Sequence, residues 1–234
     1  LAPSMAAALL ATMVSRYVFG RAPVFHFGML PPFPLRYMWL VVILGIIIGL
    51  AGVVFNKGLL NIHYFYDLPV FRNNYMRIAF ALCMAGILGY VFPEVLGGGN
   101  DLVNSLYTLP LSLKLFAGLL IGKFLFTLVS YGCGVPGGFF LPMLVLGALT
   151  GGITGIVFVH LGLISSYYLS NIVVISMAAF FAASVQSPVT GTILIMEMTS
   201  SYEHLLVLCT ASLVALVVAQ LCQGEPIYEA LLQR

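Results

Sequence analysis

The sequence predicts an all-α integral membrane protein with about ten helices of uneven length, several of them too short to cross a bilayer. Hydrophobic residues make up 62% of the 234-residue chain and charged residues only 7%, whereas a soluble domain carries about 25% charged residues. No charged residue occurs from Phe124 to Met196, and this run can hold several spanning helices of about 20 residues. Glycine and proline clusters interrupt the apolar segments, and such interruptions are typical of transporter binding sites.

The apolar segments between these interruptions define the predicted helices. In chain order they are residues 3–19, 36–57, 75–92, 101–108, 112–130, 139–162, 171–184, 188–199, 203–221 and 225–234. The second carries Gly45, Gly49 and Gly52, a spacing that lets helices approach closely in lipid. The polar residues Asn61 and His63 indicate that a loop follows it.

Composition also argues against other classes of protein. The net charge is only +2, and no Lys/Arg cluster with interleaved aromatic residues points to a nucleic-acid partner. The four cysteines, Cys83, Cys133, Cys209 and Cys222, lack metal-ligand spacing. No HExxH motif or pair of intramembrane aspartates indicates an enzyme. We therefore expect no catalytic residue, no metal and no cofactor.

The most informative stretch is residues 134–143, inside the charge-free run. Its glycines and prolines are Gly134, Pro136, Gly137, Gly138 and Pro142. Glycine permits backbone shapes closed to other residues, and proline is tolerated in the first turn of a helix. The stretch therefore predicts a loop that leads into a helix start near Phe140. A helix start presents unpaired N–H groups and the positive end of the dipole, which favour an anion. A helix break that only allows close packing gives the same pattern, so both interpretations stay open on these residues alone.

This stretch resembles the anion filter motif of the CLC family of chloride channels and chloride/proton antiporters, in which a glycine pair precedes a short apolar run and a proline. Four other motifs resemble the family in the same order, along essentially the whole chain. They are Gly45–Lys57, which ends in Phe-Asn-Lys, the triple glycine Gly97–Gly99, Ser187–Thr199 and Gly224–Tyr228.

The resemblance assigns roles to individual residues. Gly138 matches the motif glycine, the backbone N–H groups of Phe139 and Phe140 match the chloride donors, and Pro142 matches the closing proline. Tyr228 matches a tyrosine whose hydroxyl points at the central anion. A hydroxyl carries no net charge, so it can bind chloride without trapping it.

For the whole chain, the resemblance implies a single transmembrane domain over residues 1–234, the second inverted repeat of the CLC fold without the first. It implies chloride transport, either by a voltage-gated channel or by an H⁺/Cl⁻ antiporter. The choice depends on glutamates of the first repeat and stays open. A fluoride/proton antiporter and a non-transporting membrane scaffold are the alternatives. The expected partners are chloride, membrane lipid, a second copy in a homodimer and a first repeat that completes the pore. The expected location is the plasma membrane of a prokaryote, as a multi-pass protein.

Glu197 ends the charge-free run, and an acidic group there is a candidate for function. It could relay protons, form a buried carboxyl at the dimer interface, or lie near water at a helix end. By the resemblance, the transported proton uses glutamates of the other repeat. Glu197 matches neither of them, and we favour the two structural interpretations.

Overall fold

The computed structural model describes residues 2–20, 24–25, 27, 30–71, 73–106, 112–135, 137–200 and 202–233, and these form ten α-helices joined by loops and short 3₁₀ turns. The helices are α1 (Ala2–Phe19), α2 (Met38–Tyr66), α3 (Asn74–Val91), α4 (Asn100–Ser105), α5 (Leu113–Gly132), α6 (Phe140–His160), α7 (Leu169–Val185), α8 (Pro188–Thr199), α9 (Leu205–Leu221) and α10 (Ile227–Leu232). Their number and uneven length confirm the predicted fold class.

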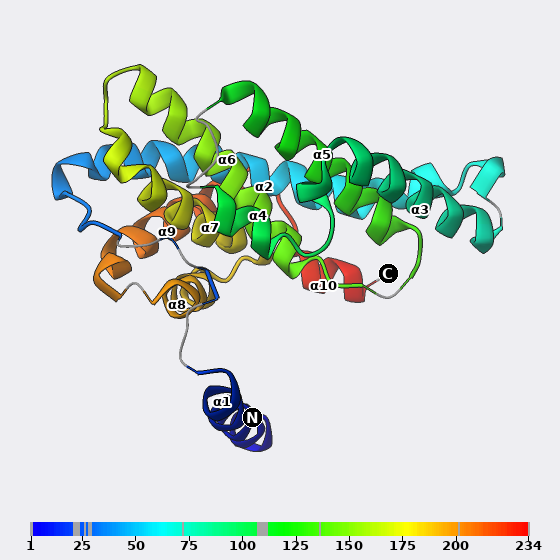
Figure 1. Cartoon of the computed structure of the whole chain (residues 1–234), viewed down its shortest axis with the longest axis horizontal. Helices are drawn as coiled ribbons and strands as arrows, with labels where there is room; N and C mark the ends of the chain where they lie inside the picture. The colour runs from blue at the N-terminus through cyan, green and yellow to red at the C-terminus, as the bar shows by residue number, and fades with distance from the viewer. Residues whose placement is uncertain are drawn as a thin grey trace.

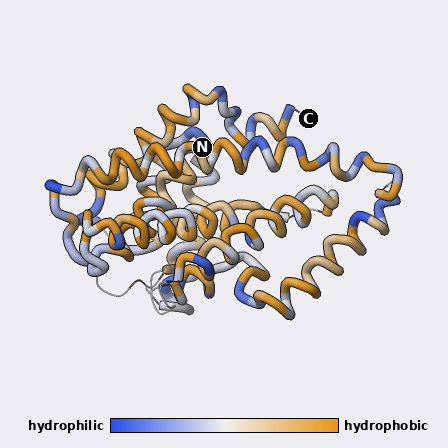
Figure 2. The backbone as a smooth tube through the Cα atoms, turned by 90° about the horizontal axis from the view of Figure 1, so that it is seen from above, coloured by the Kyte–Doolittle hydropathy of each residue, from blue (hydrophilic) through white to orange (hydrophobic). Residues whose placement is uncertain are grey.

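The chain is an integral membrane protein. Six of the described helical segments are long and apolar enough to cross a membrane, and they contain α2, α3, α5, α6, α7 and α9. By contrast, α4, α8 and α10 have 6, 12 and 6 residues, well short of the roughly 20 that a spanning helix needs. Figure 2 shows hydrophobic residues along most of the length of the helices.

One predicted boundary is wrong. The polar residues Asn61 and His63 do not begin a loop, because α2 continues to Tyr66. A helix of 29 residues is about 43 Å long at 1.5 Å per residue, longer than the roughly 30 Å of the hydrocarbon core. No glycine or proline interrupts this last part of α2, so its polar residues mark the emergence of the helix from the hydrocarbon rather than its end.

The core forms around α7, which packs against α2, α6, α8 and α9. All residues from Asn171 to Ser184 are buried, as expected of a helix that is apolar all round. Figure 1 shows α2, α6, α7 and α9 crossing at one end of the molecule, while α3 and the end of α5 extend toward the other.

The predicted close approach at the glycines of α2 is confirmed. A Cβ atom at Gly45 would lie 2.9 Å from Val214 Cβ of α9, and one at Gly52 would lie 2.8 Å from Ala183 Cβ of α7. Real Cβ atoms do not come this close, so only glycine lets α2 lie directly against both neighbours.

The helix α1 is set apart from the other helices, beyond α8 (Figure 1). Its described side chains from Pro3 to Val18 are exposed. Arg16 Nη2 lies 3.0 Å from Glu197 Oε1 of α8. An exposed ion pair of this kind contributes only about 0–1 kcal/mol to stability.

Candidate functional site

The loop between α5 and α6 forms the first part of the site. The helix α5 ends at Gly132, and Gly134 then adopts a φ of +83°, a left-handed backbone that glycine adopts without steric cost. Gly137 and Gly138 lead from this turn into α6, which begins at Phe140. The predicted loop and helix start are therefore present. Pro136 lies outside the described residues.

The start of α6 presents backbone donors without partners in the helix. The first hydrogen bond of the helix is donated by the Met143 N–H to the Phe139 carbonyl at 3.0 Å. Pro142 is the third residue of the helix and has no N–H. No side chain caps the helix at Phe139, and within the described chain no loop hydrogen bond is donated by the N–H of Phe139, Phe140 or Leu141. These donors lie at the positive end of a 21-residue helix, where a negative charge is favoured.

Tyr228 of α10 reaches the same helix start from a distant part of the sequence. Its ring lies 5.2 Å from the ring of Phe139, with an interplanar angle of 32°. Tyr131 of α5 packs edge-on against Phe139, also with centroids 5.2 Å apart. The Tyr228 side chain is 47% exposed, and its hydroxyl has no hydrogen-bond partner among the described residues. Partial burial raises the pKa of Tyr228 above its usual value, so the hydroxyl stays a neutral donor near pH 7.

Two amide side chains fix the segment that carries Tyr228. Asn56 Nδ2 of α2 donates to the carbonyls of Ser184 at 2.8 Å and Glu225 at 2.9 Å. Gln186, at the end of α7, donates to the Gly224 carbonyl at 2.6 Å. Since all these carbonyls belong to loops or helix ends, α2 and α7 together determine where α10 begins. The sequence prediction missed this role of Asn56, although Asn56 belongs to the Phe-Asn-Lys motif that was recognised.

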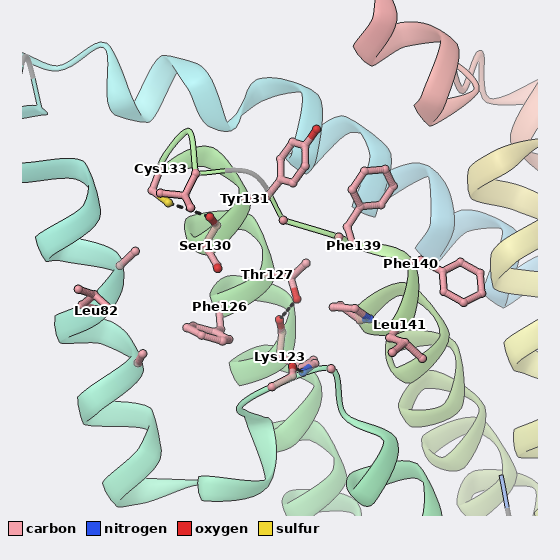
Figure 3. A pocket seen from close by; sticks show the side chains of 18 of the residues that line it. Leu82, Lys123, Phe126, Thr127, Ser130, Tyr131, Cys133, Phe139, Phe140 and Leu141 are labelled. Atoms are coloured by element: carbon pink, nitrogen blue, oxygen red, sulfur yellow. Dashed lines mark hydrogen bonds between the residues drawn. The ribbon is translucent and has the colours of Figure 1, made fainter. Parts of the chain in front are cut away.

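A cavity of about 580 Å³ lies between α3, α5 and the start of α6. Residues 137–142 form one of its walls, and α5 contributes Lys123 and Thr127. Figure 3 shows Tyr131, Phe139 and Phe140 on one side of the cavity and Leu82 of α3 on the other. Gly138, Phe139 and Phe140 thus line the cavity, whereas Tyr228 contacts Phe139 without lining it.

Lys123 is a second residue that sequence reasoning missed. Its side chain is 0% exposed, and its Nζ donates to the carbonyls of Val95 at 2.8 Å and Gly97 at 2.7 Å. Burial of a lysine in a membrane helix is costly. The signal was present in the sequence, because Lys123 is the one charged residue between Leu115 and Met196.

Glu197 lies outside this site. It is exposed near the end of α8, where it pairs with Arg16 and accepts a hydrogen bond from the Tyr202 hydroxyl at 3.1 Å. Among the three interpretations, this geometry agrees with a carboxylate near a helix end.

The sequence matches a family model described as the voltage gated chloride channel over residues 1–220. The chain belongs to this family. The family resemblance inferred from the motifs is therefore confirmed, and the ten-helix architecture is that of the CLC fold.

Similar proteins extend this result. The chain is 35% identical over 235 residues to the H⁺/Cl⁻ exchange transporter ClcA of Vibrio vulnificus strain YJ016, and equally to that of strain CMCP6. These alignments cover 97% of this chain and 49% of each relative. A solved structure described as a slow cyanobacterial Cl⁻/H⁺ antiporter matches with a TM-score of 0.85 at 30% identity, over 97% of this chain and 53% of that one. This CLC chain thus spans about half the length of the relatives it matches.

The structure positions the predicted residues without assigning their roles. It packs the ring of Tyr228 against the ring of Phe139, the residue before Phe140. It places Gly134, Gly137 and Gly138 in the segment that leads into α6 and Pro142 in the first turn of α6. Chloride binding by Gly138, Phe139, Phe140 and Tyr228 stays a prediction.

Proposed function

We propose that this chain forms the second repeat of a CLC-type transporter and supplies one wall of a chloride pathway in the plasma membrane of a prokaryote. The observation that carries the proposal is the start of α6. There the N–H groups of Phe139 and Phe140 have no partner in the described chain. The ring of Tyr228 packs against the ring of Phe139, and Phe139 and Phe140 line a largely apolar cavity.

These donors suit an ion that must both bind and leave. Backbone N–H groups and a tyrosine hydroxyl carry partial charges, so they replace part of the hydration shell of an anion without holding it as a salt bridge would. The helix dipole of α6 adds a favourable potential at the same point. Selection of an anion over a cation follows from the sign of these partial charges.

Coupled exchange with protons is the mode of transport that we favour, because the similar proteins named above are chloride/proton exchangers. None of the described residues that line the cavity carries a carboxylate. The groups that would carry the proton are therefore expected in the first repeat, as the family resemblance also implies. A fluoride/proton antiporter is the second candidate, and the same assay separates the two.

The test is ion efflux from proteoliposomes that contain the full transporter of which this chain is part. We expect chloride efflux when an ionophore balances the charge that chloride carries out. We also expect protons to be transported against their own gradient when the chloride gradient is the only driving force. Chloride efflux without coupled proton movement would indicate a channel, and faster fluoride efflux would indicate the fluoride branch. A correctly folded protein that moves none of these ions would contradict the proposed function and favour the scaffold interpretation.

A further inference from the structure

Lys123 presents an unusual electrostatic situation inside the membrane domain. The chain contains seven acidic residues, and all of them lie in the described ranges. The one ion pair within these ranges joins Arg16 to Glu197. The acceptors that bind the Lys123 ammonium group are instead the neutral carbonyls of Val95 and Gly97. Its positive charge is therefore held in place but is not neutralised by a carboxylate of this chain.

The loop around the ammonium group is shaped to accept it. Gly99 has a φ of +95°, and a Cβ atom there would lie 2.6 Å from Val145 Cγ2 and 3.3 Å from Lys123 Nζ. The triple glycine thus lets the backbone wrap closely around the end of the lysine side chain and aim two carbonyls at it. An ammonium group has three N–H donors, and these carbonyls occupy two of them.

The position of this charge relative to the cavity matters for function. Lys123 belongs to the wall of the cavity that Gly138, Phe139 and Phe140 also line, as Figure 3 shows. Its side chain is nevertheless 0% exposed, so an ion in the cavity meets the electric field of the ammonium group rather than the group itself. Such a charge attracts an anion without forming the direct contact that would hold it.

We propose that Lys123 is a positioning residue for the anion, a fixed positive charge behind the cavity wall that raises the affinity of the pathway for monovalent anions. This inference rests on the proposed function and goes beyond it, because it adds a charged residue to a site otherwise made of neutral donors. At an effective dielectric constant of about 20, removal of one unit charge from within about 10 Å of an anion weakens binding roughly tenfold.

The test compares variants of the full transporter by calorimetric titration with chloride and nitrate in detergent. Lys123→Met removes the charge and keeps the apolar stem, whereas Lys123→Arg keeps the charge. Lys114→Met is the matched control, because Lys114 lies at the exposed start of the same helix. We expect roughly tenfold weaker binding of both anions in Lys123→Met and wild-type binding in Lys123→Arg and Lys114→Met.

A structural role of Lys123 gives a different result. Lys123→Met leaves the Val95 and Gly97 carbonyls without their donor. The melting temperature of the variant should therefore fall whether or not the charge of Lys123 affects anion binding. A folded Lys123→Met protein with wild-type affinity for both anions would overturn the inference while leaving the proposed function intact. Absence of anion binding and efflux in the wild-type transporter would contradict the proposed function itself.

A second pair of variants covers the case in which Lys123→Met fails to fold. Thr127 lies one helical turn after Lys123 and lines the same cavity. Thr127→Asp places a carboxylate on the same cavity wall, one helical turn after Lys123, and Thr127→Asn is its neutral counterpart. We expect weaker anion binding in Thr127→Asp than in Thr127→Asn, and equal binding in the two would overturn the inference.

Discussion

Tyr228 shows how this chain positions a single donor. Its own contact is the ring of Phe139, at 5.2 Å, and its backbone is fixed by the amide groups of Asn56 and Gln186. The position of the hydroxyl therefore depends on residues outside the proposed anion site.

Tyr228→Phe removes the hydroxyl and keeps the ring that packs on Phe139. We expect chloride affinity to fall at least about tenfold, since one hydrogen bond to a charged group contributes about 1.5–3 kcal/mol. Because burial raises the pKa of Tyr228 above about 10, the wild-type affinity should not fall through this group between about pH 6 and pH 9. Calorimetric titration with chloride at several pH values measures both effects. Tyr75→Phe, at an exposed site at the start of α3, is the control, and unchanged affinity in Tyr228→Phe would contradict the assigned role.

Asn56→Leu keeps the size of the side chain but removes both hydrogen bonds to the Ser184 and Glu225 carbonyls. The free energy of unfolding should fall by about 1–3 kcal/mol, because buried acceptors lose their donor. Chloride affinity should fall as well, through the displaced Tyr228. In a double-mutant cycle, Asn56→Leu should weaken binding much less when Tyr228→Phe is already present. Additive effects on affinity would show that Asn56 does not act through Tyr228.

Sequence reasoning at this scale found the residues of the helix start and missed those that support them. Gly138, Phe139 and Phe140 are consecutive residues of one motif, so the sequence itself shows that they lie close together. Lys123 donates to carbonyls 26 and 28 residues earlier in the chain, and Asn56 donates to one 169 residues later. Backbone carbonyls carry no sequence signal, so such partners cannot be predicted from residue types.

At the scale of helices, the hydropathy pattern located each of the ten described helices but not every helix boundary. The apolar runs and their glycine or proline ends predicted α8 and the start of α6 closely, because both ends have strong local signals. The end of α2 was missed, since polarity alone cannot separate a loop from a helix that continues into the headgroup region. The glycines of α2 were correctly predicted as contact points.

Helix packing makes a sharp prediction at Gly147 of α6. A Cβ atom there would lie 2.8 Å from Phe180 Cβ and 3.0 Å from the Ser176 carbonyl, both on α7. Gly147→Ala must therefore push α6 away from the most buried helix, and we expect a loss of about 1–3 kcal/mol in the free energy of unfolding. Gly118→Ala on α5 is the matched control, because its Cβ atom would meet Phe92 Cζ at an ordinary 3.7 Å. Thermal unfolding in detergent gives the comparison, and equal stability of the two variants would contradict the packing described here.

At the scale of the molecule, the proposed anion donors lie on an exposed face of the chain. Tyr228 is 47% exposed and Gly138 is also exposed, so the proposed anion site opens away from the core around α7. The relatives are about twice as long as this chain, which agrees with our proposal that a first repeat covers this face. The sequence predicted the helical fold, but it carries no local signature of the surface that we propose a first repeat to cover.

Reconstitution of the 234-residue chain alone and together with a separately expressed first repeat tests this arrangement. We expect chloride efflux from proteoliposomes only when both are present, because one wall cannot enclose a pathway across the bilayer. A Tyr228→Phe chain with the first repeat is the control for assembly, and it should restore efflux with weaker chloride affinity. Efflux from the isolated chain at the rate of the combined halves would contradict the proposed single wall.

The buried lysine of α5 also has a consequence for biosynthesis. Lys123 lies near the middle of Leu113–Gly132, where a lysine costs about 2.5–3.5 kcal/mol when a helix enters the bilayer from the translocon. The carbonyls that accept hydrogen bonds from its ammonium group belong to the turn that follows α3. This turn leaves the ribosome before α5 does. That earlier segment can therefore remain near the translocon and shield the ammonium group as α5 enters, so that α3 and α5 are inserted as a pair rather than one after the other.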